Sequence, residues 1–395
     1  MKDFLCKNIL SRGLYTLGLF LITIICTNQG FLTFDNTLVT KLFSYVQNMR
    51  CNGILIPDNV RLIDTQYDNE LVSVSNKLGR PLGTKTITDR KTLYTFLDNL
   101  SSTNSYNYIF LDLGFHADYN SPWDSLLFNK IRTMPRIVVA QSGAMDSKWG
   151  LEHKAGFVEY TSMLVNGDMS CYSIADRNGF PSFAARAYEE LYETKLSTHI
   201  WGTFCSDNRK LAMRTITPKQ RLIFNIYRDE NKNPNNRKIG TSHLGRQSVC
   251  QPLGIETSKW NILVDKRSGR DPYKGKDIII GNFSEQDLHS TYCGNVYGPI
   301  INYNAFLALK NGEHLVNIWC WILLIVLFYG MVLFAEIAAT ISVAGWLIYC
   351  KNLAVSIIIG IIFYLTFGTL FSISIVSIML TIYSLRIKFR KSLES

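Results

Sequence analysis

The sequence predicts an α/β protein: an extracytoplasmic α/β sandwich with a mostly parallel sheet, plus four transmembrane helices, one N-terminal and three C-terminal. Charge-free runs at both ends of the chain predict the membrane helices, and the longest of them, 352–385, has 34 residues without an acidic or basic side chain. Alternating strand and helix patterns between these runs predict the α/β domain. Water-soluble helices do not continue that long without a charge, so a wholly soluble protein is excluded.

The N-terminal segment is predicted to be a retained membrane anchor. Residues 1–12 contain Lys2, Lys7 and Arg12, and residues 13–34 contain no charge. A signal peptide begins similarly but ends in small residues at a cleavage site, and no such residues close this apolar run. Because basic residues flank the cytoplasmic side of membrane helices, 1–12 is expected in the cytoplasm.

Three more spans are expected within 315–385. Residues 315–335 provide 21 charge-free positions, which is enough for a helix to cross the bilayer. The run 352–385 would be about 51 Å long as one helix, so a break at 367–369 is expected to divide it into two spans. The intervening stretch 336–351 is expected to be a short loop, and 386–395 a basic cytoplasmic tail.

The remaining residues, 35–314, form the predicted extracytoplasmic domain. Four short apolar runs rich in β-branched or aromatic residues are too short for helices and fit strands buried on both faces: 60–64, 108–112, 136–140 and 277–281.

Helices are expected among these strands. Residues 89–100 have apolar side chains at helical spacing after Thr88, a candidate N-cap, and further helices are expected at 182–195 and 298–310. Strand, helix and strand in this order favour parallel strands joined by right-handed crossovers.

These features resemble the CHASE type-2 domain, an extracellular sensory domain associated with cyclases and histidine kinases. The resemblance extends over essentially the whole chain, and its most specific part is the late block from Lys276 to Ala305. The quoted segments are the strand ending at Asp64, Thr88-Asp89-Arg90, Phe110-Leu111-Asp112-Leu113-Gly114-Phe115, Asp124 before Leu126-Leu127, 276–283, 287–291, Gly298-Pro299-Ile300 and Asn304-Ala305.

The resemblance implies an integral membrane sensor or receptor of the bacterial inner membrane, with its large domain in the periplasm or outside. Family members are typically fused to kinase, cyclase or protease-like output domains, whereas this chain resembles versions without one. It is therefore expected to detect a ligand or partner and to relay that state to a separate membrane or cytoplasmic effector. Membrane lipid is a further expected partner, and a homodimer remains open. The alternative is a structural or assembly subunit of a membrane complex.

Polar residues near the carboxyl ends of the predicted strands are the candidate ligand-binding residues. Ligands of open α/β sheets usually bind at that edge. The alternative is that the carboxylates cap helices or bond loop backbone, as Asp commonly does at such turns. The candidates are Asp64, Asp112, His116, Asp287, His289 and Thr291. The spacing of Asp112, His116 and Asp118 is compatible with a metal but weak by itself, and neither a metal nor a cofactor is expected.

Other functional classes receive little support. The sequence has no G-x-S-x-G, no H-E-x-x-H and no glycine-rich phosphate loop, so no enzyme is expected. Half of the +10 net charge flanks the apolar runs, so no nucleic-acid partner is expected either. The five cysteines outside the spans allow at most two disulfides, with the pairing open: Cys51, Cys171, Cys205, Cys250 and Cys293.

Overall fold

The structure is a computed structural model of the chain. It describes residues 2–27, 59–66, 68–75, 81–115, 121–141, 149–158, 160–162, 169–176, 178–199, 202–205, 219–221, 271, 273–291, 294–311, 318–341, 345–367 and 372–394.

A sheet of five parallel strands forms the centre of the α/β domain, which confirms the fold class and the mostly parallel sheet. The strand order is β1-β12-β4-β5-β6, and every pairing in it is parallel. Three predicted strands match, and the fourth lies one residue later than 136–140. The strands are β1 (Val60–Asp64), β4 (Tyr108–Asp112), β5 (Ile137–Gln141), β6 (Ala155–Phe157) and β12 (Asp277–Gly281).

The late strand β12 lies between two early strands, β1 and β4. The register pairs Asp64 with Gly281 and Gly281 with Asp112, so the carboxyl ends of these three strands lie at one edge of the sheet. Asp64, Asp112 and Asp287 were expected on one edge, and the register places the first two there, at the edge from which the chain continues to Asp287. Almost all side chains in these strands are buried, as expected for a parallel sheet covered on both faces.

Helices pack against both faces of the sheet. Helices α3 (Arg90–Thr103) and α4 (Asp124–Thr133) bury their apolar faces with strand residues such as Ile109, Leu111 and Ile280. Helices α5 (Phe183–Leu191) and α7 (Gly298–Lys310) cover the other face with Tyr108, Phe110 and Ile279. The alternation of side chains along each strand supplies both cores.

The helix starts follow local capping chemistry. Helix α3 begins one residue later than expected, because Asp89 and not Thr88 is the N-cap and its Oδ1 accepts a hydrogen bond from Thr92 N at 3.0 Å. Ser182 caps α5 in the same way, and α5 ends at Leu191, before the expected 195. Helix α7 has the predicted bounds.

Smaller, mostly antiparallel elements, which were not predicted, accompany the central sheet. Strands β2 (Asn69–Ser75) and β3 (Pro81–Thr88) form a hairpin between β1 and α3. A second sheet contains β7 (Tyr160–Ser162), β8 (Met169–Ser173), β11 (Lys219–Arg221), β13 (Leu288–Thr291) and β14 (Gly294–Tyr297), and β9 (Leu196–His199) pairs with β10 (Gly202–Cys205).

Four apolar helices pack together outside the α/β domain: α1 (Lys2–Thr27), α8 (Ile318–Ile341), α9 (Gly345–Phe367) and α10 (Ile373–Glu394). The prediction that 336–351 forms a loop is wrong, because Glu336 lies in α8 and Lys351 lies in α9. The expected break at 367–369 coincides with the end of α9. The basic segment 386–394, expected as a tail, continues α10 as helix.

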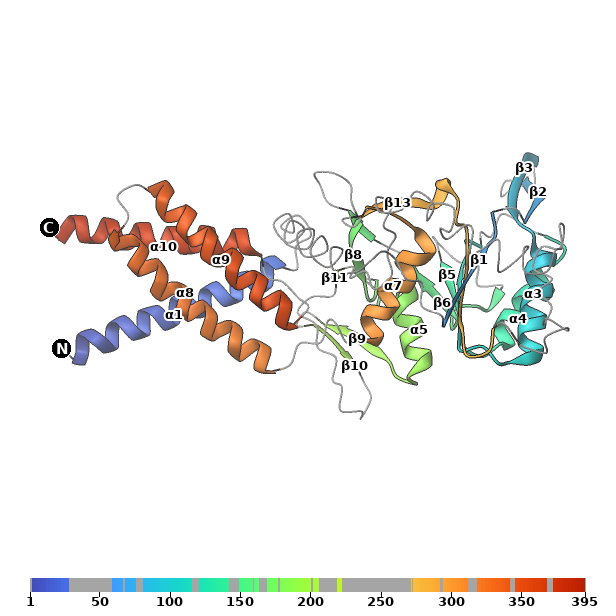
Figure 1. Cartoon of the computed structure of the whole chain (residues 1–395), viewed down its shortest axis with the longest axis horizontal. Helices are drawn as coiled ribbons and strands as arrows, with labels where there is room; N and C mark the ends of the chain where they lie inside the picture. The colour runs from blue at the N-terminus through green and yellow to red at the C-terminus, as the bar shows by residue number, and fades with distance from the viewer. Residues whose placement is uncertain are drawn as a thin grey trace.

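Among the described helices, two are long and apolar enough to cross a membrane, through Trp321–Ala339 and Gly345–Phe363. Helix α1 contains the shorter apolar stretch Ile9–Thr23. Figure 1 shows the four helices at one end of the molecule and the α/β domain at the other, with both chain termini at the end of the bundle far from the domain. The bundle therefore supports membrane association.

Candidate functional site

A cleft opens at the carboxyl edge of the parallel sheet. After β1 and β4 the chain leads to α3 and α4 on one face, whereas after β12 it leads to α7 on the other face. Such a reversal between neighbouring strands leaves a crevice at the strand ends, where ligands of open α/β sheets bind. The cleft has a volume of about 1140 Å³.

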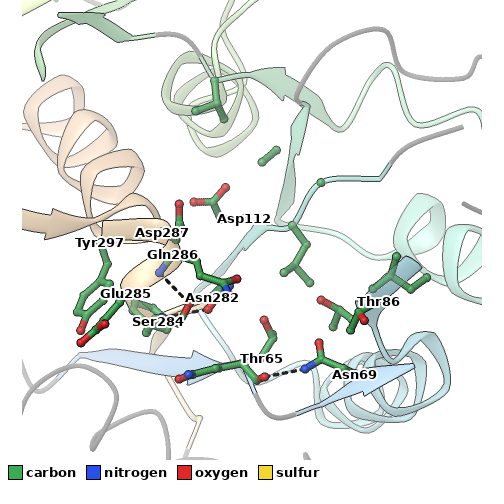
Figure 2. A pocket seen from close by; sticks show the side chains of 18 of the residues that line it. Thr65, Asn69, Thr86, Asp112, Asn282, Ser284, Glu285, Gln286, Asp287 and Tyr297 are labelled. Carbon is green, nitrogen blue, oxygen red and sulfur yellow. Dashed lines mark hydrogen bonds between the residues drawn. The ribbon is translucent and has the colours of Figure 1, made fainter. Parts of the chain in front are cut away.

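Mostly hydrogen-bonding side chains line the cleft. They come from the end of β4, from the loops after β1 and β12, from the β2–β3 hairpin and from the end of β14. Figure 2 shows Asp112 and Asp287 close together on one side and Asn69 and Thr86 on another. The polar lining residues are Thr65, Gln66, Asn69, Lys85, Thr86, Thr88, Asp112, Asn282, Ser284, Glu285, Gln286, Asp287 and Tyr297. Three carboxylates and one ammonium group make this lining acidic.

Asp112, the last residue of β4, is held by helix α7. Asn302 donates a hydrogen bond from Nδ2 to Asp112 Oδ2 at 2.7 Å, and its Oδ1 accepts one from the Tyr160 hydroxyl. Burial raises the pKa of the Asp112 carboxyl group to about 7, and the nearby Asp287 carboxylate adds to this effect. Asn302 and His289 oppose it. Asp112 is therefore a carboxyl group that titrates near neutral pH.

Asp287 lies between His289 and the start of α7. His289 Nε2 is 3.0 Å from Asp287 Oδ1, and this contact raises the pKa of the imidazole above its usual value. A Cβ at Gly298, the first residue of α7, would lie 2.8 Å from both carboxylate oxygens of Asp287. Glycine thus lets the carboxylate approach the helix N-terminus, where the backbone dipole favours negative charge.

Asp64 hydrogen-bonds the backbone of two loops. Its Oδ1 accepts hydrogen bonds from Gln66 N at 3.0 Å and Phe283 N at 3.2 Å, which fastens the turn after β1 to the loop after β12. The side chain is buried. The backbone-bonding interpretation therefore describes Asp64, which supports the cleft without lining it.

The other candidate residues have different outcomes. His289 reaches the site through Asp287. Thr291 is buried in β13, pairs with Gly294 and does not line the cleft. His116 and Asp118 lie outside the described residues. No group of three or more His, Cys, Asp or Glu suited to a metal occurs among the residues that are described.

Several residues of the site carried no sequence signal. Asn302 and Tyr160 come from α7 and β7, far from β4 in sequence, and only the tertiary structure brings them to Asp112. The β2–β3 hairpin contributes Asn69, Lys85 and Thr86 to the cleft. The alternation Val72-Ser73-Val74-Ser75 in β2 is a strand signal, but it does not indicate a role in the cleft.

Two other residues quoted in the family resemblance meet beside this edge. Arg90 and Asp124, at the N-termini of α3 and α4, form a buried ion pair with Arg90 Nε 3.5 Å from Asp124 Oδ1. The Arg90 guanidinium also stacks over Phe115, with its Cζ 4.4 Å from the ring centroid. Asp124 Oδ2 accepts a hydrogen bond from Ser121 N at 2.8 Å. The pair joins both helices to the loop after β4.

Comparisons with protein-family models, curated proteins and solved structures gave no match to this chain. The structure itself shows a protein with an α/β domain, a polar cleft at the carboxyl edge of its parallel sheet and a bundle of apolar helices.

Proposed function

We propose that this protein is an integral membrane sensor whose α/β domain binds a polar solute in the cleft and relays its presence through the membrane helices to a separate effector. The proposal builds on the resemblance to CHASE type-2 domains. In this proposal the protein spans the bacterial inner membrane four times, with both termini in the cytoplasm and the α/β domain in the periplasm or outside.

The single observation that carries the proposal is the position of α7. Its first residue contacts Asp287, its Asn302 bonds Asp112, and its last residue, Lys310, precedes α8 by only seven residues. One helix thus touches two of the three acidic side chains of the cleft, Asp112 and Asp287, and is followed closely in sequence by the first helix of the C-terminal bundle. Solute binding that moves Asp112 or Asp287 would displace α7, and rigid helices transmit such displacements.

The chemistry of the cleft favours a solute with hydroxyl or cationic groups. Amide and hydroxyl side chains supply donors and acceptors, and the carboxylates exceed the one lysine. A cationic group beside Asp112 would lower the pKa of that carboxyl group, so binding would release a proton near neutral pH.

The four-span orientation is supported by an ion pair within the bundle. Arg12 of α1 makes two hydrogen bonds to Glu336 of α8, at 2.9 and 2.7 Å, and Tyr383 of α10 donates to Glu336 Oε1 at 2.7 Å. Arg12, in the first half of α1, therefore lies level with the last turns of α8 and with the middle of α10, and both chain termini lie at the same end of the bundle (Figure 1). With Lys2, Lys7 and Arg12 in the cytoplasm, the end of α10 would also be cytoplasmic.

Binding is tested by thermal unfolding of the full chain in detergent, with millimolar amino acids, polyamines, sugars and nucleotides added one at a time. The proposal predicts stabilisation by one of these classes, lost in Asp112→Ala and kept in the control Lys274→Gln, which changes an exposed side chain. No stabilisation by any class contradicts solute binding.

Relay is tested by hydrogen exchange. Asn302→Ala removes the bond between α7 and Asp112, and the proposal predicts changed protection in the first turns of α8. The control Lys310→Gln, on the same helix but away from the cleft, should leave α8 unchanged. A change confined to the α/β domain would favour the alternative of a structural or assembly subunit.

A further inference from the structure

The outward side of α10 carries an unbroken apolar stripe along most of the helix. Its side chains are 42% to 72% exposed and follow each other at steps of three or four residues, which places them on one side: Ile378, Ile382, Leu385, Phe389 and Leu393. The most exposed two, Phe389 and Leu393, lie within the basic segment that ends the helix. The exposed apolar side of α10 therefore continues into its basic C-terminal segment.

Basic residues alternate with the last members of this stripe in the sequence of α10. Arg386, Lys388, Arg390 and Lys391 occur within six positions, and Arg386 and Arg390 are exposed. The last acidic residue before them is Glu336, which bonds Arg12 and Tyr383. The end of α10 is thus a basic amphipathic helix, a pattern typical of segments at a membrane surface.

The depth of this segment follows from its contacts with α8. Ser384 donates a hydrogen bond to the carbonyl oxygen of Ala335 at 2.9 Å, and both helices run in the same direction in the proposed topology. The apolar segment of α8 continues to Ala339, about 6 Å beyond Ala335 at 1.5 Å per residue. Arg386 and Lys388 therefore lie beside the last apolar turn of α8.

The apolar part of α10 is also too short to cross a bilayer. Residues 373–385 extend about 20 Å as a helix, whereas the hydrocarbon core is about 30 Å thick. The full helix, 22 residues long, extends about 33 Å. Helix α10 crosses only if its basic end lies in the headgroup layer, where long basic side chains reach toward phosphate.

We propose that residues 386–394 of α10 bind the headgroups of anionic phospholipids at the cytoplasmic surface, with Arg386 and Arg390 on the phosphates and the exposed apolar side of the helix turned toward the lipid. The inference rests on the membrane topology proposed above. Charge complementarity and continuity with the lipid-facing stripe favour a lipid surface over a protein partner, because basic residues directly cytoplasmic of a span attract anionic leaflets.

The test titrates the purified full-length protein, in a neutral detergent, with phosphatidylglycerol and phosphatidylcholine and follows bound lipid by native mass spectrometry. Arg386→Gln/Arg390→Gln should weaken phosphatidylglycerol binding about 25-fold, from roughly fivefold for each basic side chain. Its phosphatidylcholine binding should not change. Arg386→Lys/Arg390→Lys should bind phosphatidylglycerol within about threefold of the wild type, since it keeps both charges.

A matched control removes the same charge elsewhere. Arg132→Gln/Lys274→Gln changes two exposed basic residues of the α/β domain and should bind phosphatidylglycerol as the wild type does. Equal loss in this control, wild-type affinity in the Arg386→Gln/Arg390→Gln variant, or displacement of the lipid by millimolar inorganic phosphate would each overturn the inference.

The same preparations separate this inference from the proposed function. Release of the chain from membranes by alkaline carbonate contradicts the proposed topology. Stable insertion with unchanged phosphatidylglycerol affinity contradicts the lipid site alone, and solute stabilisation through the cleft should persist in all α10 variants.

Discussion

Replacing Asp112 with Asn should stabilise the protein at alkaline pH and have little effect at acidic pH. The raised pKa of about 7, against an ordinary value of 3.8, means that the folded protein holds a proton on Asp112 more tightly than the unfolded chain does. The folded state therefore carries a penalty that is complete above pH 7 and is relieved as the pH falls toward 4. An asparagine can keep the bond from Asn302 through its oxygen and has no charge to repel Asp287.

The size of the effect follows from the pKa. At 1.36 kcal/mol for each tenfold change in proton affinity, the penalty is about 4 kcal/mol at most. Asp112 is only partly buried and opens into the cleft, so solvent weakens the penalty and we expect about 2 kcal/mol above pH 8. Thermal unfolding of the full chain in detergent between pH 4.5 and 8.5 measures it.

The control for this prediction is Asp98→Asn. Asp98 Oδ1 bonds Lys130 Nζ at 2.6 Å on the surface of α3, with the Asp98 side chain 51% exposed. Exposed pairs contribute less than about 1 kcal/mol, so this variant should show no matching gain at alkaline pH. If Asp112→Asn destabilised the protein at pH 8.5, or stabilised it equally at pH 4.5, the assigned environment of Asp112 would be wrong.

Three further predictions test the packing and charges. Gly156→Ala should lower the free energy of unfolding by more than about 2 kcal/mol, because its Cβ would lie 2.5 Å from backbone atoms at the start of α5. Gly330→Ala in α8 has open space at its Cβ and should stay within about 1 kcal/mol of the wild type, as thermal unfolding of both variants would show. His289→Gln should lower the unfolding temperature at pH 5.5 but not at pH 9. A raised imidazole pKa contributes stability that is complete below pH 6.5 and is lost as the pH rises through the folded-state pKa, so an equal decrease at both pH values would contradict the ion pair. Glu336→Ala should lower the unfolding temperature more than the double variant Arg12→Ala/Glu336→Ala does, because the single variant leaves the Arg12 cation without its partner. A larger decrease in the double variant than in Glu336→Ala would argue against coupling of the two residues.

The sequence by itself determined the local elements that depend on apolar periodicity and capping. Strands 60–64, 108–112 and 277–281 and helix 298–310 have the expected bounds, because continuous apolar runs and a proline at a helix start are local signals. The bounds of the bundle helices were less accurate. Glu336 and Lys351 lie within the apolar segments Trp321–Ala339 and Gly345–Phe363, and the basic segment 386–394 continues α10, so a charged residue did not mark the end of a helix.

The edge shared by Asp64, Asp112 and Asp287 was predictable because parallel strands place their carboxyl ends together. The separate roles of these residues were not predictable. Asp64 bonds loop backbone, Asp112 receives Asn302, and Asp287 meets His289 and the start of α7. The bonds of Asp64 to Phe283 N and of Asp112 to Asn302 join residues distant in sequence, whereas Asp287 contacts residues close to it in the chain.

Only the tertiary structure decided where β12 lies and what surrounds Asp112. Inserting β12 between β1 and β4 brings α7 to the opposite face from α3 and α4, and this reversal opens the cleft. The pKa of Asp112 depends on burial and on the distance to Asp287, and the ion pair of Arg12 with Glu336 joins positions 324 residues apart. Electrostatic interactions act through space, so a one-dimensional pattern records the charges but not which of them meet.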